Sequence, residues 1–280
     1  MTTIHRVISV CSIVCVIVAC ACIIGCVSKK SNNEQPATST PWHYTVIAVT
    51  NGGTITGTVK INGNIPVVPD LAITHDNNHC GTAKPSPRLL CGANGGVSNA
   101  YVYLQDISTG KTFAVPIQPL FISQKDCMYQ PHTVAVPVGA GVNIRNDDHI
   151  LHNIHIYSGD ESVWNQAQPI SGQTNVFTPR QPGILRMQCD AGHIWMSGYI
   201  FVAGNPYYAL TDSSGTFTIT DVPPGTYTIS CWHEGWNATK NLNHSGALLS
   251  YSYDAPYEMR QNVTIHSNDT VHIDFAITPH

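Results

Sequence analysis

The sequence GILRMQCDAGHIWMSGYIFV, residues 183–202, contains two predicted strands joined by a loop with a histidine and a methionine. The first strand is predicted over Gly183–Cys189 and the second over Tyr199–Val202. No stretch of about eleven residues, here or elsewhere in the chain, shows a convincing helical period. This part of the chain is therefore predicted to be β-structure.

Short segments of the same kind, separated by turn signals, recur on both sides of this stretch. They are Thr54–Ile61, Ala100–Leu104, Thr133–Val138, Gly141–Asn146, His152–Tyr157, Thr216–Ile219, Thr226–Cys231, Asn262–His266 and Val271–Ile277. Many short strands with turns between them are typical of β-sandwiches, so the sequence predicts an all-β protein.

Length and composition limit the classes of protein that the chain can belong to. Its 280 residues correspond to about two domains, each large enough to bury a core without added metal or disulfides. Charged residues make up 11% of the chain, and the net charge is −4. A protein that binds nucleic acid needs clustered Lys and Arg, so a nucleic-acid partner is not expected.

An apolar run at the amino terminus predicts export. Val7–Val27 contains no charge and follows Arg6, as in a secretory signal or an uncleaved membrane anchor. The end of this run, Ile23-Ile24-Gly25-Cys26, resembles the box of a lipoprotein signal peptide, which implies a lipid on Cys26. A lipoprotein signal or anchor over residues 1–26 and a polar linker over 27–46 are therefore expected, with a plain cleaved signal as an alternative.

The cysteines divide into groups by position. Of the ten, four lie in residues 1–25 and one is Cys26, which leaves five: Cys80, Cys91, Cys127, Cys189 and Cys231. Exported proteins form disulfides, but five is an odd number, so one cysteine is expected to have another role.

Two separated stretches resemble a single module. Residues 53–59 with 100–104, and residues 211–219 with 222–227, resemble the transthyretin-like sandwich of carboxypeptidase regulatory-like domains. The later stretch carries an Asp-x-x-Gly turn and a Pro-Pro-Gly turn. We therefore predict that this sandwich comprises residues 47–109 and 204–280, with a second domain, residues 110–203, inserted into it.

The predicted inserted domain contains a set of metal-ligand side chains. Cys189, His193 and Met196 form the pattern Cys-x3-His-x2-Met, and His152 lies upstream at the start of a predicted strand. A thiolate, two imidazoles and a thioether suit copper in a trigonal site with a weak axial ligand.

This arrangement resembles a cupredoxin. The resemblance implies a Greek-key sandwich over residues 110–203 and one type-1-like copper held by His152, Cys189, His193 and Met196. The Cys-to-His spacing is one residue longer than in amicyanin-like proteins, which leaves the exact geometry open. A binuclear site would need another cysteine at position 185, which is Leu185.

Neighbouring residues are assigned supporting roles. The amide of Asn153 is expected to tether the ligand loop, as the resemblance implies. His155 should point to the other face of its strand, as a support or an alternative ligand. Ile194 and Trp195 are candidates for a hydrophobic rim for partner docking, although Trp195 equally fits a place in the core. Met196 has a similar alternative, because Met packs more often than it ligates.

The remaining cysteines can form two disulfides if Cys189 binds copper. Cys80 and Cys127 both lie in turn-like segments near the start of the insert, so this pair is expected, together with Cys91 and Cys231. Alternatively, Cys189 is itself half of a disulfide.

A wider resemblance covers most of the chain beyond the leader. Its segments are His79–Gly81, Val97–Val102, Asp126–His132, His152–His155, Cys189–Met196 and Trp232–Gly235. Together they resemble exported bacterial proteins that pair a cupredoxin with a carboxypeptidase regulatory-like domain, some of them labelled methylamine-utilisation proteins. This resemblance brings no established substrate.

The residues favour a membrane-anchored copper protein outside the cytoplasm that exchanges electrons with an unknown redox partner. The alternative is a carbohydrate- or protein-binding module without a redox role. An enzyme is not expected, because the sequence lacks the His-x-His pairs and the His-Cys-His segment of multicopper oxidases and the common hydrolase motifs. The cluster Trp232-His233-Glu234 is expected to pack at a strand end.

Overall fold

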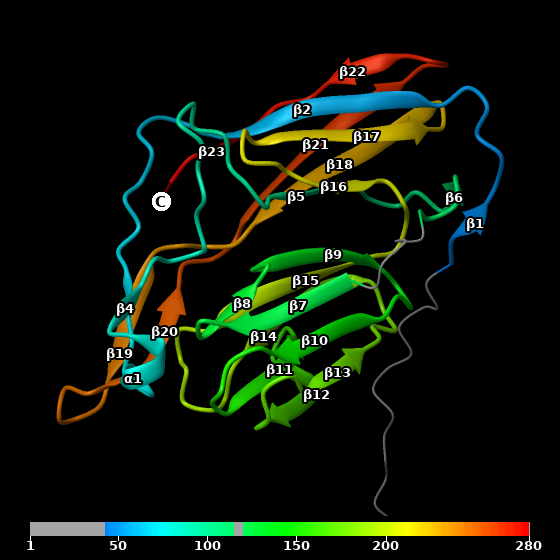
Figure 1. Cartoon of the computed structure of the whole chain (residues 1–280). Coiled ribbons are helices and arrows are strands. Elements are labelled where there is room, and N and C mark those ends of the chain that lie inside the picture. Colours follow the sequence, from blue (N-terminus) through cyan, green and yellow to red (C-terminus); the bar gives the residue numbers. More distant parts are fainter. Residues whose placement is uncertain (1–42, 115–119, 280) are drawn as a thin grey trace, which may run out of the picture. The chain divides into compact units, whose positions relative to one another are not determined.

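The computed structural model describes residues 43–114 and 120–279. Strands dominate these residues, and the single helix among them is the four-residue α1, Asn77–Cys80 (Figure 1). The predicted all-β class is confirmed. The apolar amino-terminal run, Cys26 and most of the predicted linker lie outside the described residues. Within the described part, no helix has the length and hydropathy needed to span a membrane.

Strands between residues 120 and 203 form what we call the central sandwich. One of its sheets has the order β13 (Thr174–Phe177), β10 (Val142–Asn146), β7 (Leu120–Lys125) and β8 (Met128–Gln130). The other has the order β12 (Glu161–Gln168), β11 (His152–Ser158), β14 (Gly183–Gln188), β15 (Ser197–Ala203) and β9 (Thr133–Pro137). Both sheets contribute to one core, in which Ile122, Ile144, Ile154 and Met187 are fully buried.

Strands before and after this range form the flanking sandwich. One sheet has the order β16 (Tyr208–Leu210), β5 (Tyr101–Leu104), β18 (Gly225–His233) and β21 (Tyr257–Ile265). The other has the order β17 (Thr216–Val222), β2 (Gly53–Ile61) and β22 (Thr270–His272), and β23 (Phe275–Ile277) also pairs with β2. The blue β2 thus runs beside the yellow β17, although the two are far apart in sequence (Figure 1).

The alternation of β2 explains its place in the flanking sandwich. Ile55, Val59 and Ile61 are buried on one face, because every second side chain of a strand points the same way. Gly57 is on this face too, and a Cβ there would lie 1.7 Å from the carbonyl oxygen of Ile273. Only glycine allows this close backbone approach. The domain boundaries predicted at residues 47, 110 and 204 stay a prediction.

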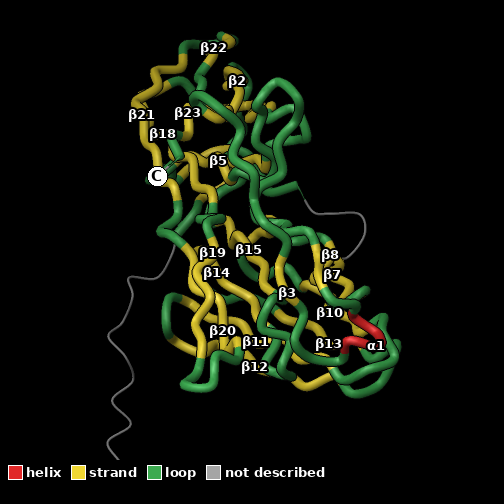
Figure 2. The backbone as a smooth tube through the Cα atoms, turned by 90° about the vertical axis from the view of Figure 1, so that its left-hand side faces the viewer, coloured by secondary structure: helices red, strands yellow, loops and turns green. Residues whose placement is uncertain are grey.

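Short strand pairs complete the architecture. They are β1 (Thr45–Val46) with β6 (Thr109–Gly110), β3 (Leu71–Ala72) with β4 (Ala83–Lys84), and β19 (Ala238–Leu242) with β20 (Leu248–Tyr253). Leu71, Ile73 and Cys80 pack into the core of the central sandwich. Figure 2 shows β3 and the red α1 on the side that faces the viewer.

A buried ionic cluster joins the two sandwiches. Glu234, just after β18, pairs with Arg88 at 2.6 Å and with the imidazole of His132, which precedes β9. All three side chains are at most 7% exposed. Arg88 also donates hydrogen bonds to the carbonyl of Gly235 at 2.9 Å and the hydroxyl of Ser197 at 3.2 Å. Each ion in the cluster therefore has an opposite charge or a polar partner.

The cluster makes stability depend on keeping Glu234 ionised. Burial acts to raise the pKa of Glu234, but the charges of His132 and Arg88 lower it below its usual value. A carboxyl whose pKa is lowered in the folded state stabilises the fold at pH values above its pKa in the unfolded chain, which is about 4.3. This contribution is lost as the pH falls through the lower pKa of the folded state. An unpaired carboxylate left at this depth would be strongly destabilising.

Replacement of the buried cation tests this cluster. Arg88→Met removes the permanent positive charge that pairs with Glu234 and should lower the free energy of unfolding by about 3–5 kcal/mol. Arg260 is exposed and lies 3.8 Å from Glu258, so Arg260→Met should change the free energy of unfolding by at most about 0.5 kcal/mol. Denaturant unfolding of both variants measures the difference, and equal stabilities would contradict the role given to Arg88.

Candidate metal centre

Three predicted ligand residues converge at one edge of the five-stranded sheet of the central sandwich. Strands β11 and β14 are antiparallel neighbours, so the start of one lies beside the end of the other. His152 is the first residue of β11, and Cys189 directly follows β14. His193 lies in the loop to β15, where Gly192 adopts a φ of +89°, a left-handed conformation that favours glycine. Local strand geometry therefore brings the three side chains together.

The donor atoms of these residues face one another. Nδ1 of His152 lies 3.1 Å from Nδ1 of His193, which in turn lies 3.5 Å from Sγ of Cys189. One ligand atom from each residue lies within 4.8 Å of the other two. Donors that lie about 2.0–2.3 Å from one metal ion are about 3–4 Å apart. The spacing therefore fits a shared metal ion.

Two carboxylates set the tautomers of the imidazoles. Nε2 of His152 donates to Asp148 at 2.8 Å, and Nε2 of His193 donates to Asp76 at 2.9 Å. With each proton on Nε2, both Nδ1 atoms carry lone pairs. Burial lowers the pKa of His193, which favours its neutral form, although Asp76 acts in the opposite direction. Two lone pairs 3.1 Å apart repel each other, and a cation between them would remove that repulsion.

Cys189 is a protonated thiol in the absence of metal. Burial raises its pKa to about 11, although nearby backbone N–H groups act to lower it. One of these is the N–H of Asn153, which donates to Sγ at 3.3 Å. Because thiols bind metal as thiolates, metal binding must displace this proton.

A site made of sulfur and imidazole donors favours some metal ions over others. A soft thiolate with two imidazoles suits copper or zinc, whereas oxygen-preferring ions such as magnesium and calcium are disfavoured. Met196, the last residue of the same loop, carries a thioether, which is a further soft donor. Met196 is 1% exposed, packs in the core cluster that contains Cys189, and its backbone N–H donates to the carbonyl of His193 at 2.9 Å. The residues present therefore fit copper.

Both predicted supporting residues contact Asp190, which follows Cys189 in the ligand loop. Oδ1 of Asn153 accepts a hydrogen bond from the backbone N–H of Asp190 at 3.2 Å. His155 pairs with the Asp190 carboxylate and stacks on Tyr157 at 4.0 Å between ring centroids. It is not part of the group of facing donors.

The sequence did not reveal the roles of Asp76 and Asp148, the two carboxylates that bind the ligand imidazoles. Burial acts to raise the pKa of Asp148, but hydrogen bonds from His152, the Cys127 N–H and His79 lower it, so this residue is ionised. Asp148 lies four residues before His152, and a search for a carboxylate partner of each ligand imidazole would have found it. Asp76 lies 117 positions before His193, and no local pattern identifies it.

A second cluster of ligand types is not a metal site. His79, Cys127 and Asp148 also lie within 4.8 Å of one another. Cys127 is oxidised in a disulfide with Cys80, with a Cα–Cα distance of 5.5 Å, and therefore offers no thiolate. The predicted Cys80–Cys127 disulfide is confirmed.

The predicted Cys91–Cys231 disulfide is wrong, because both residues are free thiols. Cys231 is in the middle of β18, between β5 and β21, with its side chain in the core of the flanking sandwich. Cys91 is half-buried and pairs with Val97 in an isolated bridge. This pair was predicted only because the two cysteines remained after the others had roles. A count of cysteines does not show whether two sulfur atoms lie close together.

Trp195 is a core residue. It is fully buried, and its Nε1 donates to the carbonyl of Cys127 at 3.0 Å. Its ring centroid lies 5.2 Å from that of His193. Trp195 therefore packs beneath the ligand loop and offers no docking surface, while Ile194 is half-buried.

Comparisons with known proteins concern parts of the chain. A family model described as polysaccharide lyase family 4, domain II, matches residues 195–273. This differs from the carboxypeptidase regulatory-like domain that the sequence resemblance implies. No curated protein sequence matches the chain.

Solved structures similar to part of the chain include a cupredoxin, a copper-containing nitrite reductase and an amicyanin. A purple cupredoxin from Nitrosopumilus maritimus is 21% identical, with a TM-score of 0.27 over 30% of this chain and 99% of that one. A copper-containing nitrite reductase from Thermus scotoductus is 22% identical, with a TM-score of 0.29 over 32% and 23%. Amicyanin from Paracoccus versutus is 18% identical, with a TM-score of 0.29 over 36% and 97%. Only the donor atoms of this chain support a metal site here.

The free thiols differ in accessibility, which alkylation can test. Cys189 and Cys231 are buried, and burial raises the pKa of both thiols. Among the free thiols of the part of the chain that the structure describes, iodoacetamide at pH 8 should therefore label Cys91 before Cys189 and Cys231 in the native, metal-free protein, and the latter two only after unfolding. Peptide mass spectrometry under non-reducing conditions locates the labels. A Cys91–Cys231 cross-link, or rapid labelling of Cys189, would show that the thiol assignment is incorrect.

Proposed function

We propose that the chain binds one copper ion through Nδ1 of His152, Nδ1 of His193 and Sγ of Cys189, with Met196 as a weaker ligand, and that it transfers single electrons. One observation carries this proposal: the two Nδ1 atoms lie 3.1 Å apart while carboxylates bind both Nε2 atoms. Bound copper would supply one-electron chemistry between its Cu(I) and Cu(II) states. The protein's part is to hold these donors in one geometry for both states.

Rigidity and burial support electron transfer rather than catalysis. His152 and Cys189 are anchored at the ends of paired strands, and Asn153 fastens the loop between Cys189 and His193. Both imidazoles are fully buried, so water and substrates are kept from the donors. We therefore propose an electron-transfer protein without enzymatic activity, whose partner is a redox protein.

We further propose that the protein works outside the cytoplasm, attached to a membrane. The Cys80–Cys127 disulfide supports an oxidising compartment, and the apolar run that ends at Cys26 supports export and lipid attachment. The central sandwich is proposed to be cupredoxin-like, with a single type-1-like copper. The flanking sandwich is proposed to be of the carboxypeptidase regulatory-like kind.

Visible absorption tests the copper proposal. The full chain with one equivalent of Cu(II) should develop an intense thiolate-to-copper charge-transfer band, which Cys189→Ser should abolish. Cys91→Ser provides the matched control, since it removes a free thiol outside the site and should leave the band unchanged. Weak copper binding without such a band, equal in the wild type and in Cys189→Ser, would contradict the proposal.

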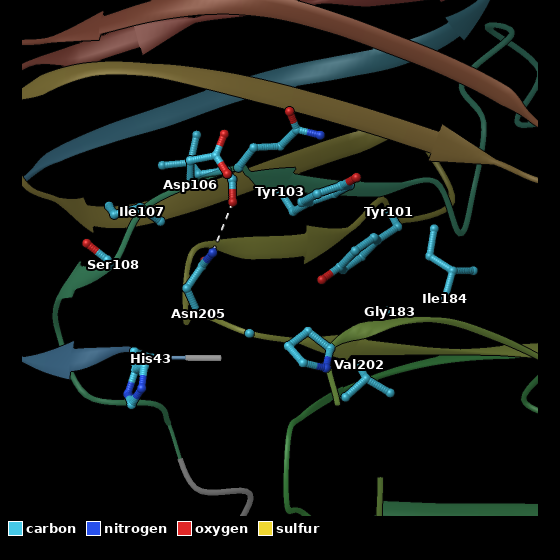
Figure 3. A pocket seen from close by; sticks show the side chains of 14 residues that line it. His43, Tyr101, Tyr103, Asp106, Ile107, Ser108, Gly183, Ile184, Val202 and Asn205 are labelled. Carbon is cyan, nitrogen blue, oxygen red and sulfur yellow. Dashed lines mark hydrogen bonds between the residues drawn. The ribbon is translucent and has the colours of Figure 1, made fainter. Parts of the chain in front are cut away.

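A cleft favours a second candidate function, carbohydrate binding without a redox role. The cleft has a volume of about 590 Å³, and its lining includes Tyr101, Tyr103, Asp106 and Asn205 (Figure 3). Tyr103 stacks on the buried ring of Tyr101 at 4.8 Å between ring centroids, and Tyr101 also stacks on Phe201 at 4.6 Å. The half-buried Tyr103 ring and the exposed Asp106 carboxylate therefore offer a stacking surface and hydrogen-bond acceptors for a sugar. The polysaccharide lyase domain description that matches residues 195–273 points the same way.

Oligosaccharide binding tests this candidate. Tyr103→Ala removes a stacking ring and should weaken binding of a sugar about tenfold, the equivalent of about 1.4 kcal/mol. Tyr103→Phe keeps the ring and should bind nearly as well as the wild type. Calorimetric titration with a panel of neutral and acidic oligosaccharides measures the affinities. Failure of the wild type to bind any of them, or equal binding by Tyr103→Ala, would remove the support for this function.

A further inference from the structure

Residues 71–81 lie against the proposed copper ligands although they come from a distant part of the sequence. We call this segment the cover. Its Asp76 accepts the hydrogen bond of His193 at 2.9 Å. Its His79 lies 3.2 Å from the second oxygen of Asp148, the carboxylate that binds His152. The cover therefore contacts one ligand imidazole directly and the other through a single carboxylate.

The cover separates the ligands from solvent. His152 and His193 have no exposed surface, whereas the side chains of His75 and Asp76 are 57% and 36% exposed. The ring centroids of His75 and His193 lie 5.7 Å apart. A Cβ on Gly192 would lie 3.1 Å from the His75 ring, so the cover also packs closely on the ligand loop. On the side of the cover, His193 therefore lies against the exposed side chains of His75 and Asp76.

Three attachments hold the cover in place. Leu71 and Ile73 are buried in the core of the central sandwich. The backbone N–H of Ala72 donates to the Tyr251 hydroxyl at 2.8 Å. The third attachment is the disulfide from Cys80 to Cys127. These attachments come from different elements, so the cover is fixed at both of its ends.

The disulfide also connects the cover to the residues that position the ligands. The backbone N–H of Cys127 donates to Asp148 at 2.8 Å, and its carbonyl accepts from Trp195 at 3.0 Å. Asp148 orients His152, and Trp195 lies within the ligand loop. A displacement of Cys80 would therefore be transmitted to both sides of the proposed site.

We infer that residues 71–81 are a disulfide-tethered cover that closes the copper centre to small anions and slows the loss of copper, with His75 packed over the ligand loop. This inference rests on the proposed copper function and makes it more specific. A closed centre exchanges electrons without binding an outside ligand. Removal of the His75 ring would uncover Gly192, next to His193, and so open the ligand loop to solvent.

Azide binding and copper release test the cover on the copper-loaded full chain. In the wild type, azide should leave the charge-transfer band unchanged, and EDTA should remove copper slowly. In His75→Ala, azide should shift the band, and EDTA should remove copper at least about tenfold faster. His75→Phe keeps a ring at this position and should behave as the wild type. His244→Ala, an exposed histidine in the turn between β19 and β20, is the matched control.

The outcomes separate this inference from the proposed function. Absence of the charge-transfer band in the wild type overturns both. Presence of the band with identical azide response and release rates in His75→Ala and the wild type overturns the cover alone. The variant Cys80→Ser/Cys127→Ser gives an independent test and should also release copper faster, while Cys91→Ser should not. If the double variant does not fold, the His75 variants still decide the question.

Discussion

Two carboxylates decide which face of each imidazole is available at the candidate metal centre. Asp148 and Asp76 bind the Nε2 atoms of His152 and His193, which directs both Nδ1 lone pairs into the same small space beside Cys189. This arrangement places two nitrogen acceptors 3.1 Å apart next to the Cys189 thiol. A bound copper ion would share both nitrogen lone pairs and the thiolate. The convergence of these three donors is therefore the feature that points to copper.

The rest of the fold serves to keep these groups in place. Asp148 is held by the backbone N–H groups of Asp126 and Cys127, and Cys127 is bonded to Cys80. The flanking sandwich contributes through the buried pairing of Arg88, Glu234 and His132. Because Arg88 also contacts Ser197, the residue after Met196, this cluster reaches the end of the ligand loop. A change far from the donors can thus alter their positions.

The features that the sequence predicted correctly are those that depend on local patterns of residues. The alternation in β2 and the many turn signals indicated an all-β chain, and the Cys-x3-His-x2-Met spacing identified two of the three donors that converge. Contacts between distant segments were beyond such reasoning, because neither periodicity nor spacing relates Asp76 to His193 or Arg88 to Glu234. The Cys91–Cys231 pairing failed for the same reason. A count of leftover cysteines cannot show that one is in the middle of a core strand.

X-ray absorption spectroscopy at the copper edge, on the full chain loaded with one equivalent of copper, tests the central claim most directly. The spectrum should show one short copper–sulfur distance and two imidazole nitrogens, and the same ligands should remain after reduction to Cu(I). Asp148 and Asp76 should not appear as ligands, because their oxygens bind the opposite side of each ring. A first shell of nitrogen and oxygen atoms without sulfur would contradict the account.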